Sequence, residues 1–400
     1  MRRSLVALLG LRSGLSLAAA PSSGNHPEWP RWCGKAYQPQ YPSFDPGGQT
    51  VEPPALPGGP ALDVQFKPRY SIYLESEAEA EFVVDAAISR WRGQPWPDLG
   101  SPDKAPAVRF TIALTTGDVL VSDTVPAGSR SNLFAFRLAG LRPRLEPYEV
   151  VLMGDGGGGE RNLTARSELF VLPEKKTGSV SRLDNVNGGI LFRGRATGGA
   201  FEPFLPHGFY ASCDNFLCDA DRLRKIRAYA GLGLNSLVSL TTVAASGDTY
   251  RELDRLDLRF MYDLRDFYKN VTAVREQVAA VRDFDALYAY WGADEPDGHQ
   301  DPFPLVVEAR EAIRSVDPYH PVSVTLNCQD YYFGQYSAGA DIVMEDAYPV
   351  GINSSFSKWG TACNATYGDC GCDNCAGDVG DVARRLDRLA RHERRLGLRP

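Results

Sequence analysis

The N-terminal half of the chain carries short hydrophobic runs in which apolar and polar residues alternate, separated by clusters of Gly, Pro, Asp or Ser. Alternation with a period of two is typical of a strand that buries one of its faces. The runs cover residues 70–74, 81–84, 108–114, 133–138, 149–153 and 168–172. We therefore predict a β-sandwich domain over residues 63–185.

From about residue 204 the pattern changes to hydrophobic strands that alternate with stretches of helical periodicity. The predicted strands cover residues 204–211, 235–240, 258–264, 287–291, 321–326 and 341–348. The predicted helices cover residues 219–230, 248–256, 271–281, a stretch from near 301 to 316, and 381–396. This order indicates right-handed βαβ units around a parallel sheet. The arginines of the last helix are expected to form a solvated face.

The predicted fold class is α/β: a (β/α)8 TIM-type barrel over residues 186–400, preceded by the β-sandwich domain. About six β/α units are visible where eight are needed. We therefore expect the barrel to be incomplete at its C-terminus, since the chain reaches Pro400 where a seventh strand should begin. A doubly wound open sheet is disfavoured because no Gly-x-Gly-x-x-Gly motif follows any of the strands.

The N-terminal residues have the composition of a secretory leader. A basic start, a short apolar run and small residues predict a signal peptide over residues 1–20, with a disordered N-terminus as the alternative. Residues 21–62 are rich in Pro, Gly and Ser and are predicted to be a linker or an irregular N-terminal arm. Glycosylation sequons begin at Asn162, Asn270, Asn353 and Asn364. We expect a secreted, extracellular protein.

The cysteines agree with an extracellular location. Eight of them stand at positions 33, 213, 218, 328, 363, 370, 372 and 375, and an even number is typical of a disulfide-bonded secreted protein. Cys213 and Cys218 are close enough in sequence to close a small local loop. The density of cysteines over residues 363–375, read alone, also suggests a zinc site. Disulfides are favoured, and the spacing leaves their connectivity open.

Composition and charge exclude several classes of protein. The chain has 400 residues, of which 43% are apolar and 23% charged, so it is not a wholly disordered chain. Lys and Arg number 43 against 50 Asp and Glu, which gives a net charge of −7. Without a basic stretch or an apolar run of membrane-spanning length, we expect no nucleic-acid and no membrane partner. The histidines show no ligand pattern, so we expect no metal. We also expect a monomer without a cofactor.

The most informative segment is residues 287–298, which runs from an aromatic strand into Asp294, Glu295 and Pro296. The C-terminal ends of parallel strands face the active site of a barrel, so both carboxyls would stand at its mouth. Burial beside Trp291 would raise the pKa of a carboxyl, which suits a general acid. Pro296 favours an extended backbone at Glu295. Alternatively, both acidic residues cap a loop and bind its amides.

The motif aromatic-Gly-x-Asp-Glu-Pro at residues 291–296, just past the fourth strand, resembles the acid/base position of clan A (β/α)8-barrel glycoside hydrolases. The resemblance covers roughly residues 204–400 in layout, and these families often carry an accessory β-sandwich. It implies cleavage of a glycosidic bond in a carbohydrate substrate, with Glu295 as the acid/base. Asp294 stands where the family commonly has Asn. The family's nucleophile, a Glu ending the seventh strand, would lie beyond residue 400.

Other strand ends suit sugar binding, because carboxylates bind hydroxyls and aromatic rings stack on pyranose faces. The candidate substrate-binding residues are Tyr210, Asp263, Trp291, Asp294, Asp346 and Tyr348. Trp291 and Tyr348 are the expected stacking residues, although packed aromatics at the barrel rim and an Asp263–Arg265 ion pair are the structural alternatives. Because side chains alternate along a strand, Asp346 and Tyr348 should share one side and Glu345 the other.

These observations predict a secreted glycoside hydrolase acting on a polysaccharide or oligosaccharide. A second carboxyl from Asp346 or Glu345 roughly 5–5.5 Å from Glu295 would imply retention of configuration, and roughly 6.5–9.5 Å would imply inversion. The alternative function is a non-catalytic extracellular carbohydrate-binding or cell-wall protein on a degenerate barrel. An extracellular disulfide-rich adhesion module is a third possibility.

Overall fold

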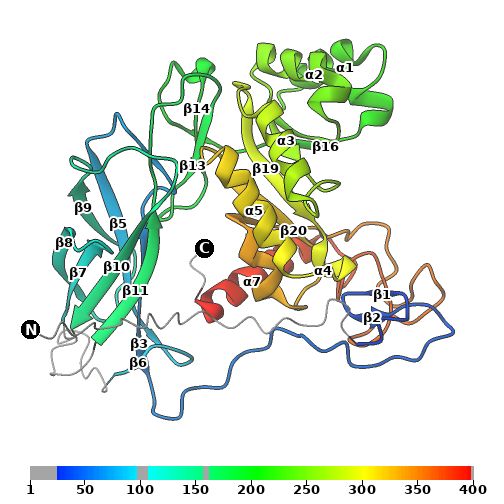
Figure 1. Cartoon of the computed structure of the whole chain (residues 1–400). Coiled ribbons are helices and arrows are strands. Elements are labelled where there is room, and N and C mark those ends of the chain that lie inside the picture. Colours follow the sequence, from blue (N-terminus) through cyan, green and yellow to red (C-terminus); the bar gives the residue numbers. More distant parts are fainter. Residues whose placement is uncertain (1–24, 97–106, 156–161, 398–400) are drawn as a thin grey trace, which may run out of the picture.

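The computed structural model describes residues 25–96, 107–155 and 162–397. Antiparallel sheets form the N-terminal half, and a parallel sheet flanked by helices forms the C-terminal half (Figure 1). The expected signal peptide at residues 1–20 lies outside the described residues. Among the described residues, every helix falls short of the length and apolarity that crossing a membrane requires.

Two four-stranded antiparallel sheets make up the N-terminal half and share one hydrophobic core. One sheet has the order β6 (Gln94–Pro95), β3 (Ala61–Pro68), β5 (Glu79–Ser89), β9 (Asn132–Arg137). The other has the order β11 (Asn162–Leu169), β10 (Tyr148–Asp155), β7 (Ala107–Leu114), β8 (Val119–Pro126). Phe82 of the first sheet and Phe110 of the second are both buried in the shared core, as the alternating pattern predicts. Strands β3 and β8 were not foreseen from the sequence. Two short strands, β4 (Tyr73–Leu74) and β12 (Val171–Leu172), pair beside the sandwich.

A small antiparallel sheet of β13 (Val180–Leu183), β14 (Ile190–Arg193) and β15 (Glu202–Phe204) links the two halves. The prediction of one strand over residues 204–211 is wrong. Phe204 ends β15, and Gly208 begins β16 (Gly208–Ala211) in the parallel sheet. Pro206 lies between them and lacks the backbone N–H that a continuous strand would need, so the chain changes sheet there.

The parallel sheet contains β16 and five further strands in the order of the sequence, which confirms the predicted alternation. The further strands are β17 (Ser236–Ser239), β18 (Arg259–Asp263), β19 (Leu287–Asp294), β20 (Val322–Leu326) and β21 (Ile342–Glu345). Over the described residues the sheet is open, with β16 and β21 as its edges. It therefore has the form of a half-barrel rather than a closed barrel.

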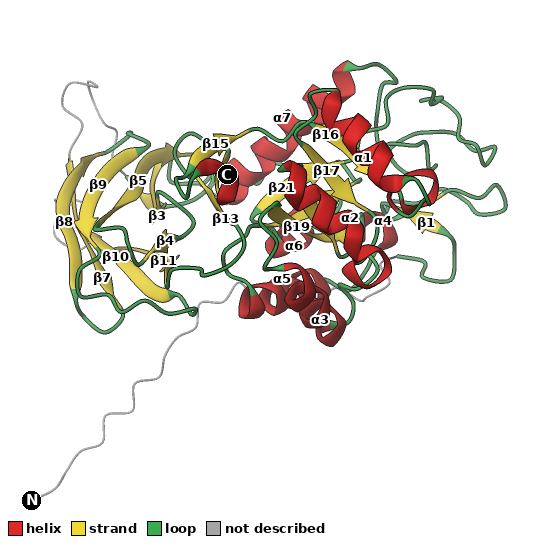
Figure 2. Ribbon diagram, turned by 90° about the horizontal axis from the view of Figure 1, so that it is seen from above, coloured by secondary structure: helices red, strands yellow, loops and turns green. Residues whose placement is uncertain are grey.

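Helices connect these strands and lie around the parallel sheet (Figure 2). The longer ones are α1 (Arg222–Gly231), α2 (Val243–Leu256), α3 (Val271–Val281), α5 (Pro304–Val316) and α7 (Gly380–Leu396). Among the described residues, the short ones are α4 (Pro296–His299), α6 (Phe333–Tyr336), two 3-10 turns (Arg195–Thr197 and Ser337–Gly339) and a π-helical turn (Cys213–Leu217). On α5, Val306, Ala309 and Ile313 are buried at the predicted helical spacing.

Residues 25–60, which fall within the predicted linker, run along the molecule as an arm that reaches the C-terminal half (Figure 1). The arm contains a hairpin of β1 (Arg31–Trp32) and β2 (Lys35–Ala36). A disulfide joins Cys33 of this hairpin to Cys328, which follows β20. We refer to residues 25–60 as the N-terminal arm.

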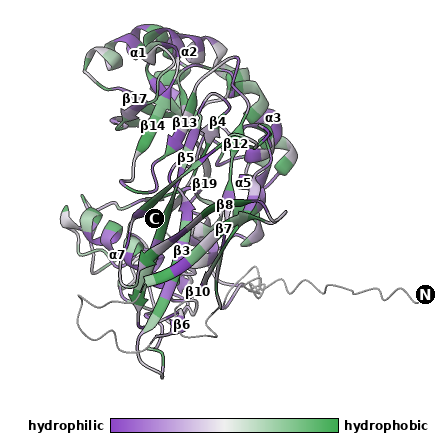
Figure 3. Ribbon diagram, turned by 90° about the vertical axis from the view of Figure 1, so that its left-hand side faces the viewer, coloured by the Kyte–Doolittle hydropathy of each residue, from purple (hydrophilic) through white to green (hydrophobic). Residues whose placement is uncertain are grey.

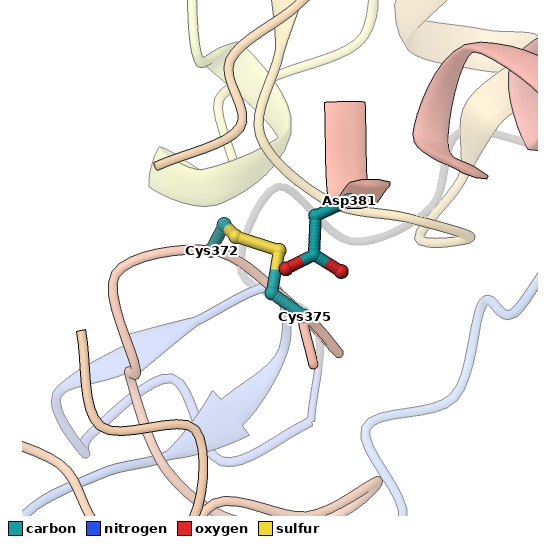
Figure 4. Close-up of side chains that lie close together, drawn as sticks. All are labelled: Cys372, Cys375 and Asp381. Carbon is teal, nitrogen blue, oxygen red and sulfur yellow. A yellow bond between two sulfur atoms is a disulfide. The ribbon is translucent and has the colours of Figure 1, made fainter. Parts of the chain in front are cut away.

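All eight cysteines form disulfides: Cys33–Cys328, Cys213–Cys218, Cys363–Cys370 and Cys372–Cys375. The local loop expected between Cys213 and Cys218 is confirmed. Asp381 lies next to the Cys372–Cys375 bond (Figure 4), and its carboxylate accepts the N–H groups of Ala376 and Gly377. Because zinc binds thiolates, the paired sulfurs contradict the zinc alternative for this segment.

Candidate active site

The candidate residues from four of the parallel strands meet at one edge of the sheet, because the carboxyl ends of parallel strands lie together. Tyr210 lies at the end of β16, Asp263 ends β18, and Asp294 ends β19. Glu295 follows β19 directly, and Asp346 follows β21 directly. The structure thus brings together residues that are up to 136 positions apart in the sequence, as 346 − 210 shows.

Arg265 contacts four of the candidate residues at this edge of the sheet. Its Nε lies 2.6 Å from Asp263 Oδ2, and its Nη1 lies 2.8 Å from Asp294 Oδ2. The guanidinium also lies over the rings of Tyr210 and Trp291, 4.6 Å and 4.9 Å from their centroids. The Asp263–Arg265 ion pair considered from the sequence is therefore present, and it extends to Asp294.

The two carboxyls beside Arg265 have raised pKa values. Burial raises the pKa of Asp263 to about 6, and the neighbouring Arg265 opposes that rise. Burial also raises the pKa of Asp294, again against the effect of Arg265. One cation therefore holds both carboxyls in place, and Asp263, which is 7% exposed, uses both of its oxygens to accept from Arg265.

Glu295 has a left-handed backbone, with φ of 46° and ψ of 40°. The expectation of an extended backbone before Pro296 is therefore wrong. Its N–H donates to the carbonyl of Thr325, and its carbonyl accepts the N–H of His299. These contacts hold Glu295 in a conformation that is strained for a residue other than glycine, and strain of this kind gathers at functional sites.

The carboxyl of Glu295 is hydrogen-bonded to the carboxyl of Asp346. Asn327 Nδ2 donates to Glu295 Oε1 at 2.7 Å, and the hydroxyl of Tyr348 donates to Asp346 Oδ2 at 2.8 Å. Burial and the proximity of Asp346 raise the pKa of Glu295 to about 8, while the Asn327 hydrogen bond opposes the rise. Glu295 is therefore protonated at neutral pH and Asp346 accepts its proton in a hydrogen bond.

Buried groups hold the backbone of Asn327. Asp297 is 1% exposed, and its carboxylate accepts the N–H groups of Asn327, Cys328 and Gly298 at 3.2, 2.8 and 2.9 Å. Burial raises the pKa of Asp297 to about 7, against these hydrogen bonds. Arg385 donates to the carbonyl of Asn327 from the other side. Asn327 is thus fixed at the end of β20.

Glu345 and Asp346 have different partners, since Asp346 bonds to Glu295 and Tyr348 whereas Glu345 binds an arginine of α7. Glu345 Oε1 lies 2.5 Å from Arg385 Nε of α7, and burial raises the pKa of Glu345 to about 7. Arg385 is 3% exposed, so the expectation that the arginines of this helix form a solvated face is wrong for this residue. Figure 3 shows hydrophobic and hydrophilic segments alternating along α7, which has one side packed against the protein.

The aromatic candidates differ in how much of the ring is open. Tyr210 is 48% exposed and Tyr348 is 52% exposed, whereas Trp291 is 8% exposed. The indole N–H of Trp291 donates to the carbonyl of Ala293, and the Tyr210 ring meets the Trp291 ring edge-to-face at 5.5 Å. The exposed aromatic rings among the candidates are therefore those of Tyr210, on β16, and Tyr348, which follows β21.

Sequence reasoning missed two residues of this site, Arg265 as a bridge to Asp294 and Asn327 as the donor to Glu295. The same rule that selected the other residues applies to Asn327, because it stands one position past the end of β20. Arg265 stands two positions past the end of β18. A systematic reading of the residues that follow each strand would have found both.

No protein-family model and no curated protein matches this sequence. Solved structures with a similar arrangement include the β-glucuronidase of Lactobacillus rhamnosus, at 13% identity and a TM-score of 0.37, over 84% of this chain and 52% of that chain. The β-D-glucuronidase of Dictyoglomus thermophilum matches at 11% identity and a TM-score of 0.36, over 86% and 52%. A putative β-galactosidase from Bacteroides fragilis matches at 14% and 0.31, over 73% and 42%. This chain spans about half the length of these proteins or less, and at these TM-scores the likeness assigns neither a family nor an activity to it.

Proposed function

We propose that this chain is a glycoside hydrolase in which Glu295 donates the proton to the leaving oxygen of a glycosidic bond. The observation that carries the proposal is the Glu295–Asp346 carboxyl pair at the C-terminal edge of the parallel sheet. A general acid must hold its proton at the working pH, and a pKa of about 8 meets that requirement for Glu295.

Asp346 serves in this proposal as the group that keeps the proton on Glu295. Because the two carboxyls are in direct hydrogen-bonded contact, they leave no room between them for the sugar carbon of a retaining mechanism or the water of an inverting one. Asp346 is therefore not assigned as the second catalytic carboxylate. The hydroxyl of Tyr348, 2.8 Å from Asp346 Oδ2, orients the Asp346 carboxylate.

The proposed substrate is a polysaccharide or oligosaccharide, since the surroundings of Glu295 suit a sugar. Asp294, fixed by Arg265, offers an acceptor for a hydroxyl group, and the buried Asp263 helps to fix Arg265. Tyr210 and Tyr348 are half-exposed and offer ring faces for stacking. Four disulfides favour an oxidising compartment, so the proposal includes secretion.

Replacing Glu295 by Gln tests the proposal, because the amide keeps the size of the side chain but has no acidic proton. Hydrolysis of aryl glycosides and cell-wall polysaccharides is expected to fall by about 10²–10⁴-fold. The matched control is Glu276→Gln, at an exposed position of α3. Equal hydrolysis by Glu295→Gln and the native protein would refute the role of Glu295. Binding of polysaccharide without turnover by the native protein would favour a carbohydrate-binding protein.

A further inference from the structure

We infer that Trp32 of the N-terminal arm is a positioning residue for Glu295 and acts through Asn327, an inference that rests on the proposed function of Glu295. Trp32 Nε1 donates to Asn327 Oδ1 at 2.8 Å, and Asn327 Nδ2 donates to Glu295 Oε1 at 2.7 Å. A carboxamide has one accepting end and one donating end. An indole that holds the oxygen end therefore aims the NH₂ end at Glu295.

The indole of Trp32 is fixed on several sides. Its ring meets the ring of His299 edge-to-face at 5.0 Å. It packs so closely on Gly298 that a Cβ at that position would lie 2.4 Å from a ring carbon. The next residue in the arm, Cys33, is bonded to Cys328, the residue after Asn327. Trp32 and Asn327 are thus each next in sequence to a cysteine of the same disulfide, which holds their backbones together.

The side-chain amide of Asn327 cannot exchange its oxygen and NH₂ positions while the Trp32 hydrogen bond exists. Its N–H is held by Asp297 and its carbonyl by Arg385, so only the side-chain torsion remains. Without the indole N–H, the amide can turn its oxygen towards Glu295, where it would accept the carboxyl proton. That reversal would favour the protonated form of Glu295, whereas the observed orientation favours the carboxylate.

The first experiment uses the native protein and needs no turnover. The indole ¹H–¹⁵N signal of Trp32, identified by its loss in Trp32→Phe, is followed by NMR from pH 5 to pH 10. We expect it to titrate with a midpoint near the Glu295 pKa of about 8 and to lose that titration in Glu295→Gln. His299 contacts the Trp32 ring, and Asp297, Asp294, Asp346 and Tyr348 also face this group of residues; the Gln variant separates their effects from that of Glu295. An unchanged titration in Glu295→Gln overturns the inference.

The second experiment is a double-mutant cycle on the pKa of Glu295, read from its ¹³C-carboxyl signal. Trp32→Phe keeps an aromatic ring and removes only the indole N–H, and it should raise that pKa by roughly half a unit to one unit. The same change made in an Asn327→Ala background should add nothing further. The control is Trp29→Phe in the same arm, which should leave the pKa of Glu295 unchanged because Trp29 stacks on His26, with ring centroids 4.1 Å apart.

The outcomes separate this inference from the proposed function. A Glu295 pKa that is the same in Trp32→Phe and the native protein overturns the positioning role, whether or not the protein hydrolyses glycosides. A shift that persists in the Asn327→Ala background shows that Trp32 does not act through Asn327 and also overturns it. Both expected NMR results, together with an absence of hydrolysis in the native protein, would overturn the proposed function and leave the positioning of Glu295 in place.

Discussion

The carboxyl of Glu295 shares a hydrogen bond with the carboxyl of Asp346, although the two residues follow different strands of the parallel sheet. Two carboxylates cannot both be charged in such contact without strong repulsion, so one of them keeps its proton. Burial and Asp346 place that proton on Glu295, and the hydroxyl of Tyr348 stabilises the charge on Asp346. This pairing keeps an acid available at neutral pH.

Replacing Asp346 by Asn should lower the pKa of Glu295 from about 8, because a neutral amide removes the negative charge that opposes ionisation. The alkaline limb of the pH profile of kcat/KM should then move to lower pH, and the ¹³C-carboxyl signal of Glu295 should titrate at lower pH as well. Asp387→Asn, at an exposed position of α7, is the control. A Glu295 titration that stays in place would contradict the pairing.

The Glu295→Gln variant should be more stable than the native protein in alkaline solution. The folded pKa of Glu295 is raised from 4.5 to about 8, so the folded state binds more protons than the unfolded state between these values. Stability therefore falls as pH rises through this window, and the variant escapes that loss. The difference in Tm between variant and native protein should grow from pH 5 to pH 8.5. Parallel curves of Tm against pH would contradict this, and Glu276→Gln should give parallel curves.

Arg385→Met should destabilise the protein by about 3–5 kcal/mol, since it leaves the carboxylate of Glu345 without its cation in a buried site. Urea unfolding measures the change. Adding Glu345→Gln should recover part of the loss, because the neutral side chain no longer needs a cation. Arg391→Met, at an exposed position of the same helix, should change stability by less than about 0.5 kcal/mol. Equal effects of Arg385→Met and Arg391→Met would refute the buried pair.

The disulfides should differ in their contribution to stability according to the length of chain they close. Cys33–Cys328 spans 295 positions, and Cys213–Cys218 spans 5. In the chain-entropy model, replacing both cysteines by Ala should cost about 5–6 kcal/mol for the first and about 2 kcal/mol for the second. Urea unfolding of the two double variants tests the order. A larger loss for the short loop would show that the N-terminal arm contributes little to the folded state.

Local patterns predicted most of the C-terminal half. The helix over 271–281 has the predicted bounds, and the position of Glu295 just past the fourth parallel strand followed from the hydrophobic run before it. The split of residues 204–211 between two sheets did not follow, because an apolar run has the same appearance in one strand or in two. The left-handed backbone of Glu295 was missed because contacts with the next strand outweighed the preference imposed by Pro296.

By itself, the sequence determined the alternation of strands and helices and therefore which residues stand at strand ends, since hydrophobic periodicity is a local property of the chain. Only the tertiary structure decided which of those residues touch. Glu295 meets Asp346 and Asn327, and Trp32 reaches Asn327 across 295 positions, as 327 − 32 shows. Contacts of this kind depend on how the sheet twists and how the arm docks, and these are set by packing between distant segments. The raised pKa of Glu295 is a consequence of that packing, because burial and neighbouring charge exist only in the folded protein.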